Sequence, residues 1–219
     1  MNKKKYPIEI EVEGQFAMFA RPDTGSDASS YIVPTKTAAK GIIEAVLNMH
    51  TVEIHPVKVE ICSPINFQSW KFNSHVFNRK PNQIKSGNAL QIGYSILVDV
   101  CYKIYADVVN TDVDRVREFL SDKEKEYVGN GTDHARGYQS QFKRWLKQGK
   151  SQRTPHLGLS EFLVSYFGPI RNNTKPDKSI NKKIPFFLNG IWDSVTFGKT
   201  VRPEFITAEV KEGVLYYVS

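Results

Sequence analysis

The chain is poor in cysteine and has no long apolar segment. Only two of its 219 residues are cysteines, and they lack the spacing of zinc ligands, so a disulfide-stapled scaffold and a zinc ribbon are excluded. No stretch approaches the ~20 apolar residues of a membrane span. The basic start is followed by a segment interrupted by three glutamates, unlike a signal peptide. These absences predict a cytoplasmic protein with no membrane partner, in which Cys62 and Cys101 are free thiols within strands.

Sequence motifs of cofactor and metal enzymes are also absent. The chain contains no Walker A, Rossmann, zincin or nucleophile-elbow pattern. Its five histidines include no pair at i, i+4 spacing, and its acids form no apparent catalytic pair, so we expect neither a metal nor a cofactor. Metal-free cleavage of RNA remains open, because the 2′-hydroxyl of the substrate is then the nucleophile and the protein supplies an acid, a base and a cation. The predicted catalytic residues are His50, His75 and Lys85, each of which would otherwise be an ordinary surface or RNA-contacting residue.

The charge of the chain is positive and unevenly distributed. Lysine and arginine number 30 against 23 acids, a net charge of +7. Residues 66–98 and 136–160 contain no acid, and residues 171–183 carry five bases against one aspartate. Clusters of one sign repel one another unless a polyanion such as a phosphate chain neutralises them. One such window would equally suit a solvated surface, but three favour a nucleic acid, and we expect them to come together as one cradle.

Hydrophobic periodicity predicts alternating strands and helices. A period of two over 94–109 predicts a long central strand. Apolar residues at three- and four-residue spacing predict one helix with Thr35 as its N-cap and another between Asp133 and Gly149. Further strands are predicted from the apolar runs 6–19, 57–67, 162–167, 184–188, 205–210 and 214–218, the last two as a hairpin, and a further helix at 113–125.

This order predicts an α+β fold with a ferredoxin-like (RRM-like) antiparallel sheet as its core. Residues 68–93 are long, basic and weakly patterned, which predicts a functional hairpin or loop. The short apolar pieces after Pro155 predict a small C-terminal β-sheet. We expect a ferredoxin-like RNA-binding domain over 1–125 and a smaller region with a helix and a β-sheet over 126–219.

Two segments are specific enough to suggest a family. One combines residues 16–22 (FAMFARP) with residues 30–45 (SYIVPTKTAAKGIIEA). The other is a Pro-x-Leu-Gly-x-x-Glu-Phe pattern formed by Pro155, Leu157, Gly158, Glu161 and Phe162. Together with the basic segment and the long strand between them, these segments resemble the "Cas-five" family of CRISPR-associated proteins in the RAMP superfamily, and look like its type I-C members.

The resemblance implies a subunit that binds the 5′ handle of the guide RNA (crRNA) and caps one end of a Cascade complex. The implied partners are the crRNA, the backbone and large subunits of that complex and, indirectly, the target DNA. Type I-C members are also typically metal-independent endoribonucleases that process the repeat transcript. The resemblance associates this activity with a Tyr just after the Glu-Ala of the first helix and a Lys-His pair shortly before the long strand. These positions correspond here to Leu47, Gly87 and Asn88.

These considerations give a set of residues and three alternative functions. The alternatives are an RNA-handle-binding subunit, an active endoribonuclease that uses substitute residues such as His50, and a general single-stranded RNA-binding protein. A purely structural alternative for His50 is that it donates a hydrogen bond to a carbonyl at the end of a helix. The residues predicted to bind RNA, as phosphate ligands or as platforms for bases, are Arg21, Thr35, Lys36, Lys40, Trp70, Lys71, Asn73, Arg79, Lys80, Tyr94, Lys143, Arg144, Lys147, Lys150, Arg153 and His156.

Overall fold

A single long strand, β6 (Leu90–Asn110), organises the fold. The computed structural model describes residues 4–25, 27–74, 80–86, 90–111, 121–123, 125, 132–192 and 200–218. Strand β1 (Tyr6–Ala17) pairs antiparallel with one edge of β6, whereas β4 (Val52–Ile61) and β5 (Asn66–Ser74) divide the other edge between them. The strand predicted over 94–109 is therefore confirmed, and it extends further at both ends.

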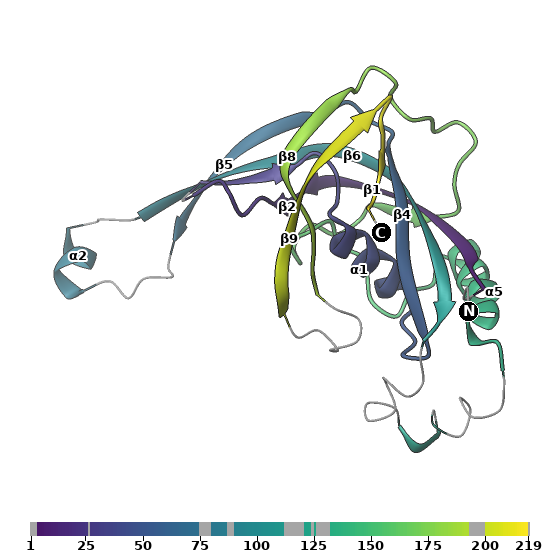
Figure 1. Ribbon diagram of the computed structural model, residues 1–219. Coiled ribbons are helices and arrows are strands. Elements are labelled where there is room, and N and C mark those ends of the chain that lie inside the picture. Colours follow the sequence, from purple (N-terminus) through teal and green to yellow (C-terminus); the bar gives the residue numbers. More distant parts are fainter. Residues whose placement is uncertain are drawn as a thin grey trace.

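The remaining strands widen this sheet on both sides. Short β7 (Tyr166–Gly168) pairs with β1, while β10 (Val214–Tyr216) pairs with β4 and leads through β9 (Thr200–Lys211) to β8 (Lys182–Trp192). Across the sheet the strands follow the order β7-β1-β6-β4-β10-β9-β8, with β3 (Ala28–Tyr31) joining β6 in parallel and β2 (Phe19–Ala20) joining β3. The result is a mixed α+β fold with a strongly curled sheet (Figure 1).

Two helices cover the concave face of the sheet. Helix α1 (Lys36–Val46) lies within the curl and contacts β4 and β8, and α5 (His134–Gln148) packs mainly on β1 (Figure 1). The predicted caps are confirmed. The Thr35 side chain accepts a hydrogen bond from the Ala38 amide, and α5 is capped by Asp133 and by Gly149, whose φ of 63° is the left-handed geometry of a helix C-cap. Among the described residues, no helix has the length and apolar character needed to cross a membrane.

The core forms between the helices and one face of the strands. Alternate residues of β1 are fully or almost fully buried, as are the inward positions of α1 and α5. Burial of each such aliphatic or aromatic side chain contributes roughly 1.5–3 kcal/mol. The two helices are also joined directly, because the Tyr138 hydroxyl of α5 donates a hydrogen bond to the Leu47 carbonyl at the end of α1.

Several predicted elements differ from the structure. The strand predicted over 57–67 is wrong in its limits: β4 ends at Ile61 and β5 starts at Asn66, because Pro64 lacks the amide that a continuous ladder requires. The two ends of 68–93 pair with each other as a hairpin, one of the two forms predicted for this segment. In the region predicted over 162–167 the strand spans only Tyr166–Gly168. The helix predicted over 113–125 falls mostly outside the described residues, whereas the closing hairpin of β9 and β10 is confirmed.

The two segments that suggested a family lie against each other. The Met18 amide donates a hydrogen bond of 2.9 Å to the Leu157 carbonyl. Gly158 follows with φ of +96°, and a Cβ at this position would lie 1.7 Å from the Met18 oxygen. Only glycine allows this approach, so the Pro-x-Leu-Gly pattern holds the chain between β1 and β2.

Candidate nucleic-acid interface

A basic arm projects from the body of the molecule. It consists of β5, the short helix α2 (Pro81–Lys85) and the first half of β6 (Figure 1). Within it β5 and β6 pair antiparallel, from Asn66 opposite Val98 at the base to Ser74 opposite Leu90. The arm carries no acid between residues 66 and 98. Its described cations Lys71, Lys80 and Lys85 all have exposed side chains. A slender basic hairpin that lacks acids is a surface suited to a phosphate chain.

The arm is anchored to the body by aromatic side chains. Trp70 of β5 makes edge-to-face contacts with Phe16 and Phe162, with ring centroids 4.7 and 5.8 Å apart. Met18 and Ile96 are buried in the same cluster, and Tyr94 packs against it. Trp70 and Tyr94 were predicted to stack on bases, and the structure places both half-buried at this junction, so packing of the arm is a role that the sequence did not indicate.

The predicted RNA ligands near the start of α1 are engaged within the protein. Arg21 donates two hydrogen bonds to Asp23, and its guanidinium lies over the Tyr31 ring. Lys36 donates to the Val218 carbonyl at 2.6 Å, and burial lowers the pKa of its ammonium group. Lys40 lies 3.6 Å from the Glu44 carboxylate, one helical turn along α1. These side chains, with the N-cap Thr35, support the fold around the helix start, and their role in RNA binding stays a prediction.

A second group of exposed cations follows α5. Phe142 and Leu146 are buried against the sheet, which turns the remaining positions of the helix toward solvent. The cations of this group are Lys143, Arg144, Lys147, Lys150 and Arg153; His156, further along the chain, is also exposed and pairs with Leu163. The arm and α5 lie at opposite ends of the molecule (Figure 1). The expectation of one common cradle is therefore wrong for these two windows, which form separate surfaces.

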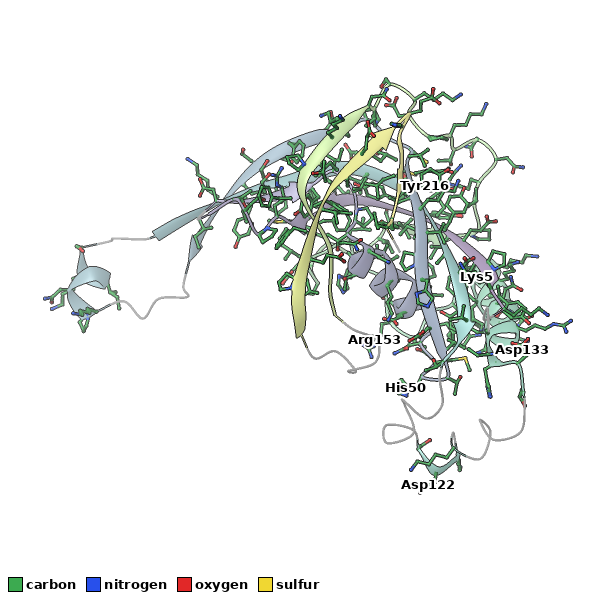
Figure 2. The ribbon with its side chains drawn as sticks, viewed as in Figure 1. Lys5, His50, Asp122, Asp133, Arg153 and Tyr216 are labelled. Carbon is green, nitrogen blue, oxygen red and sulfur yellow. The ribbon has the colours of Figure 1, made fainter. Side chains whose placement is uncertain are left out.

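The residues predicted to be catalytic are not brought together. His50 is exposed in the turn between α1 and β4, whereas Lys85 lies in α2 at the far end of the arm (Figure 2). His75 and Arg79 lie outside the described residues, as do Gly87 and Asn88. Asn73 lies in β5 opposite Gln91. Leu47, which corresponds to the Tyr that the resemblance implies, is 1% exposed. It therefore belongs to the core and is not accessible to a substrate.

One of these residues, His50, lies at the same end of α1 as a cation from a distant part of the chain. The Gln152 side chain accepts a hydrogen bond from the Asn48 amide, and the Arg153 amide donates to the Ala45 carbonyl. These bonds hold the segment after α5 against the end of α1. Figure 2 shows His50 and Arg153 at this same end of the helix. A possible base and a cation thus share one surface although they are far apart in the sequence.

The third basic segment, residues 171–183, contributes to a polar cavity on the face of the sheet opposite the helices. The cavity has a volume of about 640 Å³, and Arg171, Lys175 and Asp99 contribute to its lining. Arg171 is held by carboxylates of β1: its guanidinium lies 2.6 Å from both Glu11 and Glu13. Hydrogen bonds from its guanidinium to Glu13 raise the pKa of Arg171 still further, so this arginine is a permanent cation that already has partners. The sequence predicted a cluster of positive charge here, but it did not indicate that Arg171 pairs with Glu11 and Glu13.

Comparison with known proteins identifies the family. A family model described as "CRISPR-associated protein (Cas_Cas5)" matches residues 8–184. The chain belongs to this Cas_Cas5 family. A curated relative from Thermus thermophilus, "CRISPR pre-crRNA endoribonuclease Cas5d", is 29% identical over 80% of this chain and 68% of its own length. A relative of the same name from Mannheimia succiniciproducens is 26% identical over 95% and 93%.

The fold agrees with the family. A solved structure titled "Crystal Structure of CRISPR-associated Protein" superposes with a TM-score of 0.68 at 18% identity, covering 100% of this chain and 95% of the other. The match to the family model confirms the resemblance drawn from the motifs. In this Cas_Cas5 member the two motifs are parts of the scaffold, since they meet at Met18 and Gly158 and pack the base of the arm.

Proposed function

We propose that the chain is a subunit of a Cascade complex that binds the 5′ handle of crRNA and caps the backbone of the complex. Membership of the Cas_Cas5 family supports this function, and the arm with its acid-free sequence and exposed lysines is the single observation that carries it. Lysine ammonium groups would hold phosphates of the handle. The proposed partners are crRNA, the backbone and large subunits and, through them, the target DNA, in the cytoplasm.

The scaffold that presents the arm is, in this proposal, ferredoxin-like. Strands β1, β4, β6 and β7 alternate with α1 and α5 in the chain order β1-α1-β4-β6-α5-β7. Their order in the sheet is β7-β1-β6-β4, which is the arrangement of a split βαβ fold. The two proposed domains, 1–125 and 126–219, would then share this core, since α5 and β7 pack on β1.

Titration of RNA affinity with salt tests handle binding. We expect binding to a repeat-derived RNA to weaken as salt rises, with a logarithmic slope of about 0.7 for each phosphate that the protein neutralises. Replacing Lys71, Lys80 and Lys85 with Ala should reduce the slope by about 2. The matched control replaces Lys5, Lys125 and Lys211 with Ala. This triple variant removes the same charge outside the arm, at lysines that lie 3.4, 3.2 and 3.1 Å from an acid. Equal slopes for the two triple variants would contradict the role of the arm, and equal affinity for unrelated RNAs would favour a general single-stranded RNA-binding protein.

Cleavage of pre-crRNA is a second function, favoured by the name that both curated relatives carry. The proposed groups at the end of α1 are His50, as base or acid, and Arg153, as a cation for the phosphate; Lys85 and His75 stay alternatives. With the 2′-hydroxyl of the substrate as nucleophile, the reaction would need only proton transfer and charge stabilisation from the protein.

Incubation of the protein with repeat RNA in EDTA separates the two functions. Cleavage that is lost in His50→Ala and Arg153→Ala, with binding retained, would support the site at the end of α1. Binding without cleavage would leave the chain as a handle-binding subunit. Cleavage that survives replacement of His50, His75 and Lys85 together would rule out all three proposed catalytic residues.

A further inference from the structure

The two cysteines of the chain are direct neighbours across two strands. The ladder between β4 and β6 pairs Ile61 with Tyr102, and the next residues, Cys62 and Cys101, continue it: the Cys62 amide donates a hydrogen bond of 2.8 Å to the Cys101 carbonyl. The Cys101 amide donates to the Ser63 hydroxyl at 3.0 Å, and residues that lie directly opposite each other on antiparallel strands have Cα atoms about 4.5–5.5 Å apart. This separation lies within the range of about 4.4–6.8 Å that a disulfide spans.

Both thiols are on the same side of the sheet and are reachable from solvent. They line the polar cavity beside Arg171, together with Glu13 and Asp99. Cys101 is 7% exposed and Cys62 is half-buried, so a molecule as small as a peroxide can reach the pair from the cavity. Both cysteines are free in the structure.

The position of the pair in the chain connects it to the arm. The segment between Cys62 and Cys101 comprises β5, α2 and the first half of β6, which is the whole arm. We propose that Cys62 and Cys101 form a reversible disulfide under peroxide stress and that this bond staples the base of the arm to the sheet. The cross-link would not depend on whether the arm binds RNA, so it goes beyond the proposed function.

The oxidation takes place in two balanced steps. In the reduced protein the Cys101 thiol donates a hydrogen bond of 3.8 Å to the Glu11 carboxylate, and the Cys62 thiol donates one of 3.8 Å to the Glu60 carbonyl. The thiolate of one cysteine attacks hydrogen peroxide: the O–O bond breaks, one oxygen stays on that sulfur as a sulfenic acid and the other leaves as water. The sulfur of the other cysteine then attacks the oxidised sulfur, the S–O bond breaks, and the hydroxyl leaves as a second water with the proton of the attacking thiol. Two thiols and one peroxide give one disulfide and two waters.

Treatment of the full chain with hydrogen peroxide tests this inference. After the remaining thiols are alkylated, we expect the intact mass to fall by two hydrogen atoms, both cysteines to resist alkylation, and a single cross-linked peptide pair to appear on digestion. Dithiothreitol should reverse the change. Under the same treatment Cys62→Ser should stop at an oxygen adduct on Cys101. A wild-type protein that gains oxygen at Cys101 while Cys62 remains alkylatable, or that forms only intermolecular disulfides, would overturn the proposal.

Urea unfolding of the wild-type protein tests separately whether the disulfide stabilises the arm, and it requires no variant. Cross-linking the ends of a segment lowers the entropy of the unfolded chain. We expect the oxidised protein to unfold at higher urea than the reduced protein, and dithiothreitol to abolish the difference. Coincident unfolding curves for the two forms would refute the stapling of the arm even if the disulfide forms.

Discussion

The guanidinium of Arg171 lies 2.6 Å from the carboxylate of Glu11, whose side chain is 0% exposed. The Arg171 amide and the Thr174 hydroxyl also donate to this carboxylate, at 2.8 and 2.9 Å. The segment after β7 is thus fixed over the outer face of β1 by bonds to one buried charge. A buried carboxylate is stable only when it is paired and hydrogen-bonded, so the position of this segment depends on the contact.

Replacement of Arg171 with Ala should destabilise the protein strongly. It leaves the Glu11 charge buried without its cation, and we expect a loss of about 3 kcal/mol, near the low end for a broken buried pair because Thr174 still donates to Glu11. Urea unfolding measures the loss. Lys211→Ala is the matched control: it breaks a largely exposed pair with Glu209 at 3.1 Å, and should change stability by less than about 0.5 kcal/mol. Similar losses in both variants would show that Arg171 is not supporting a buried charge.

The same contact predicts a dependence of stability on pH. Burial raises the pKa of Glu11, but hydrogen bonds from the Arg171 amide, Thr174 and the Arg171 side chain outweigh it and hold the pKa below its ordinary value. A group with a lowered folded pKa stabilises the protein above its unfolded pKa of roughly 4.3, and this stability is lost as pH falls through the folded pKa. The urea midpoint of the wild type should therefore fall more steeply below about pH 4 than that of Glu11→Gln. Parallel pH profiles of the two proteins would contradict the assignment.

The contact between Gly158 and Met18 predicts a second large effect on stability. A side chain at position 158 would be forced to φ of +96°, and its Cβ would lie 1.7 Å from the Met18 oxygen. The strained backbone alone costs on the order of 1–3 kcal/mol, and displacement of the chain between β1 and β2 adds to it. We expect Gly158→Ala to unfold at markedly lower urea and to loosen the arm, whose base packs on Phe162 nearby in the chain.

Gly137 provides the control for this variant. It lies in α5, where a Cβ would meet nothing within 4 Å. Alanine is favoured over glycine in a helix interior by about 1 kcal/mol, so Gly137→Ala should stabilise the protein. Opposite signs for the two glycine variants are the expected result, and a neutral Gly158→Ala would show that the packing of the two motifs is not required for the fold.

Local sequence signals predicted the long strand and both main helices. The period of two in β6, the N-caps Thr35 and Asp133, and the C-terminal Gly149 are properties of neighbouring residues, and all appear in the structure. Strand β5 has no such signal. Its residues alternate without a clear apolar face, and its pairing with β6 becomes evident only when Trp70 meets Phe16 and Phe162 from distant parts of the chain.

The candidate interface was predictable in composition but not in arrangement. Glu11 alternates with the apolar residues Ile10 and Val12 of β1, which puts it opposite the core face, yet its complete burial results from a segment 160 residues away in the chain. For the same reason, acid-free windows identified the cations of the arm and of α5 but could not show that the two groups lie at opposite ends of the sheet. The location of Arg153 at the same end of α1 as His50 likewise depends on hydrogen bonds between the end of α1 and residues after α5.

The separation of the two basic surfaces predicts that they contribute to binding independently. Replacing Lys143, Arg144 and Lys147 with Ala removes the cations of α5 without touching the arm, because all three side chains are exposed on the helix. If a short handle RNA is held by the arm alone, this variant should leave its salt slope unchanged, while the slope for a longer RNA that reaches α5 should fall by about 0.7 for each phosphate no longer neutralised. Fluorescence anisotropy with short and long repeat-derived RNAs makes the comparison. Because the two surfaces lie far apart, the reductions in the arm and α5 variants should add for the long RNA. A large reduction for the short RNA in the α5 variant would contradict the separation and would place the handle on α5 instead of the arm.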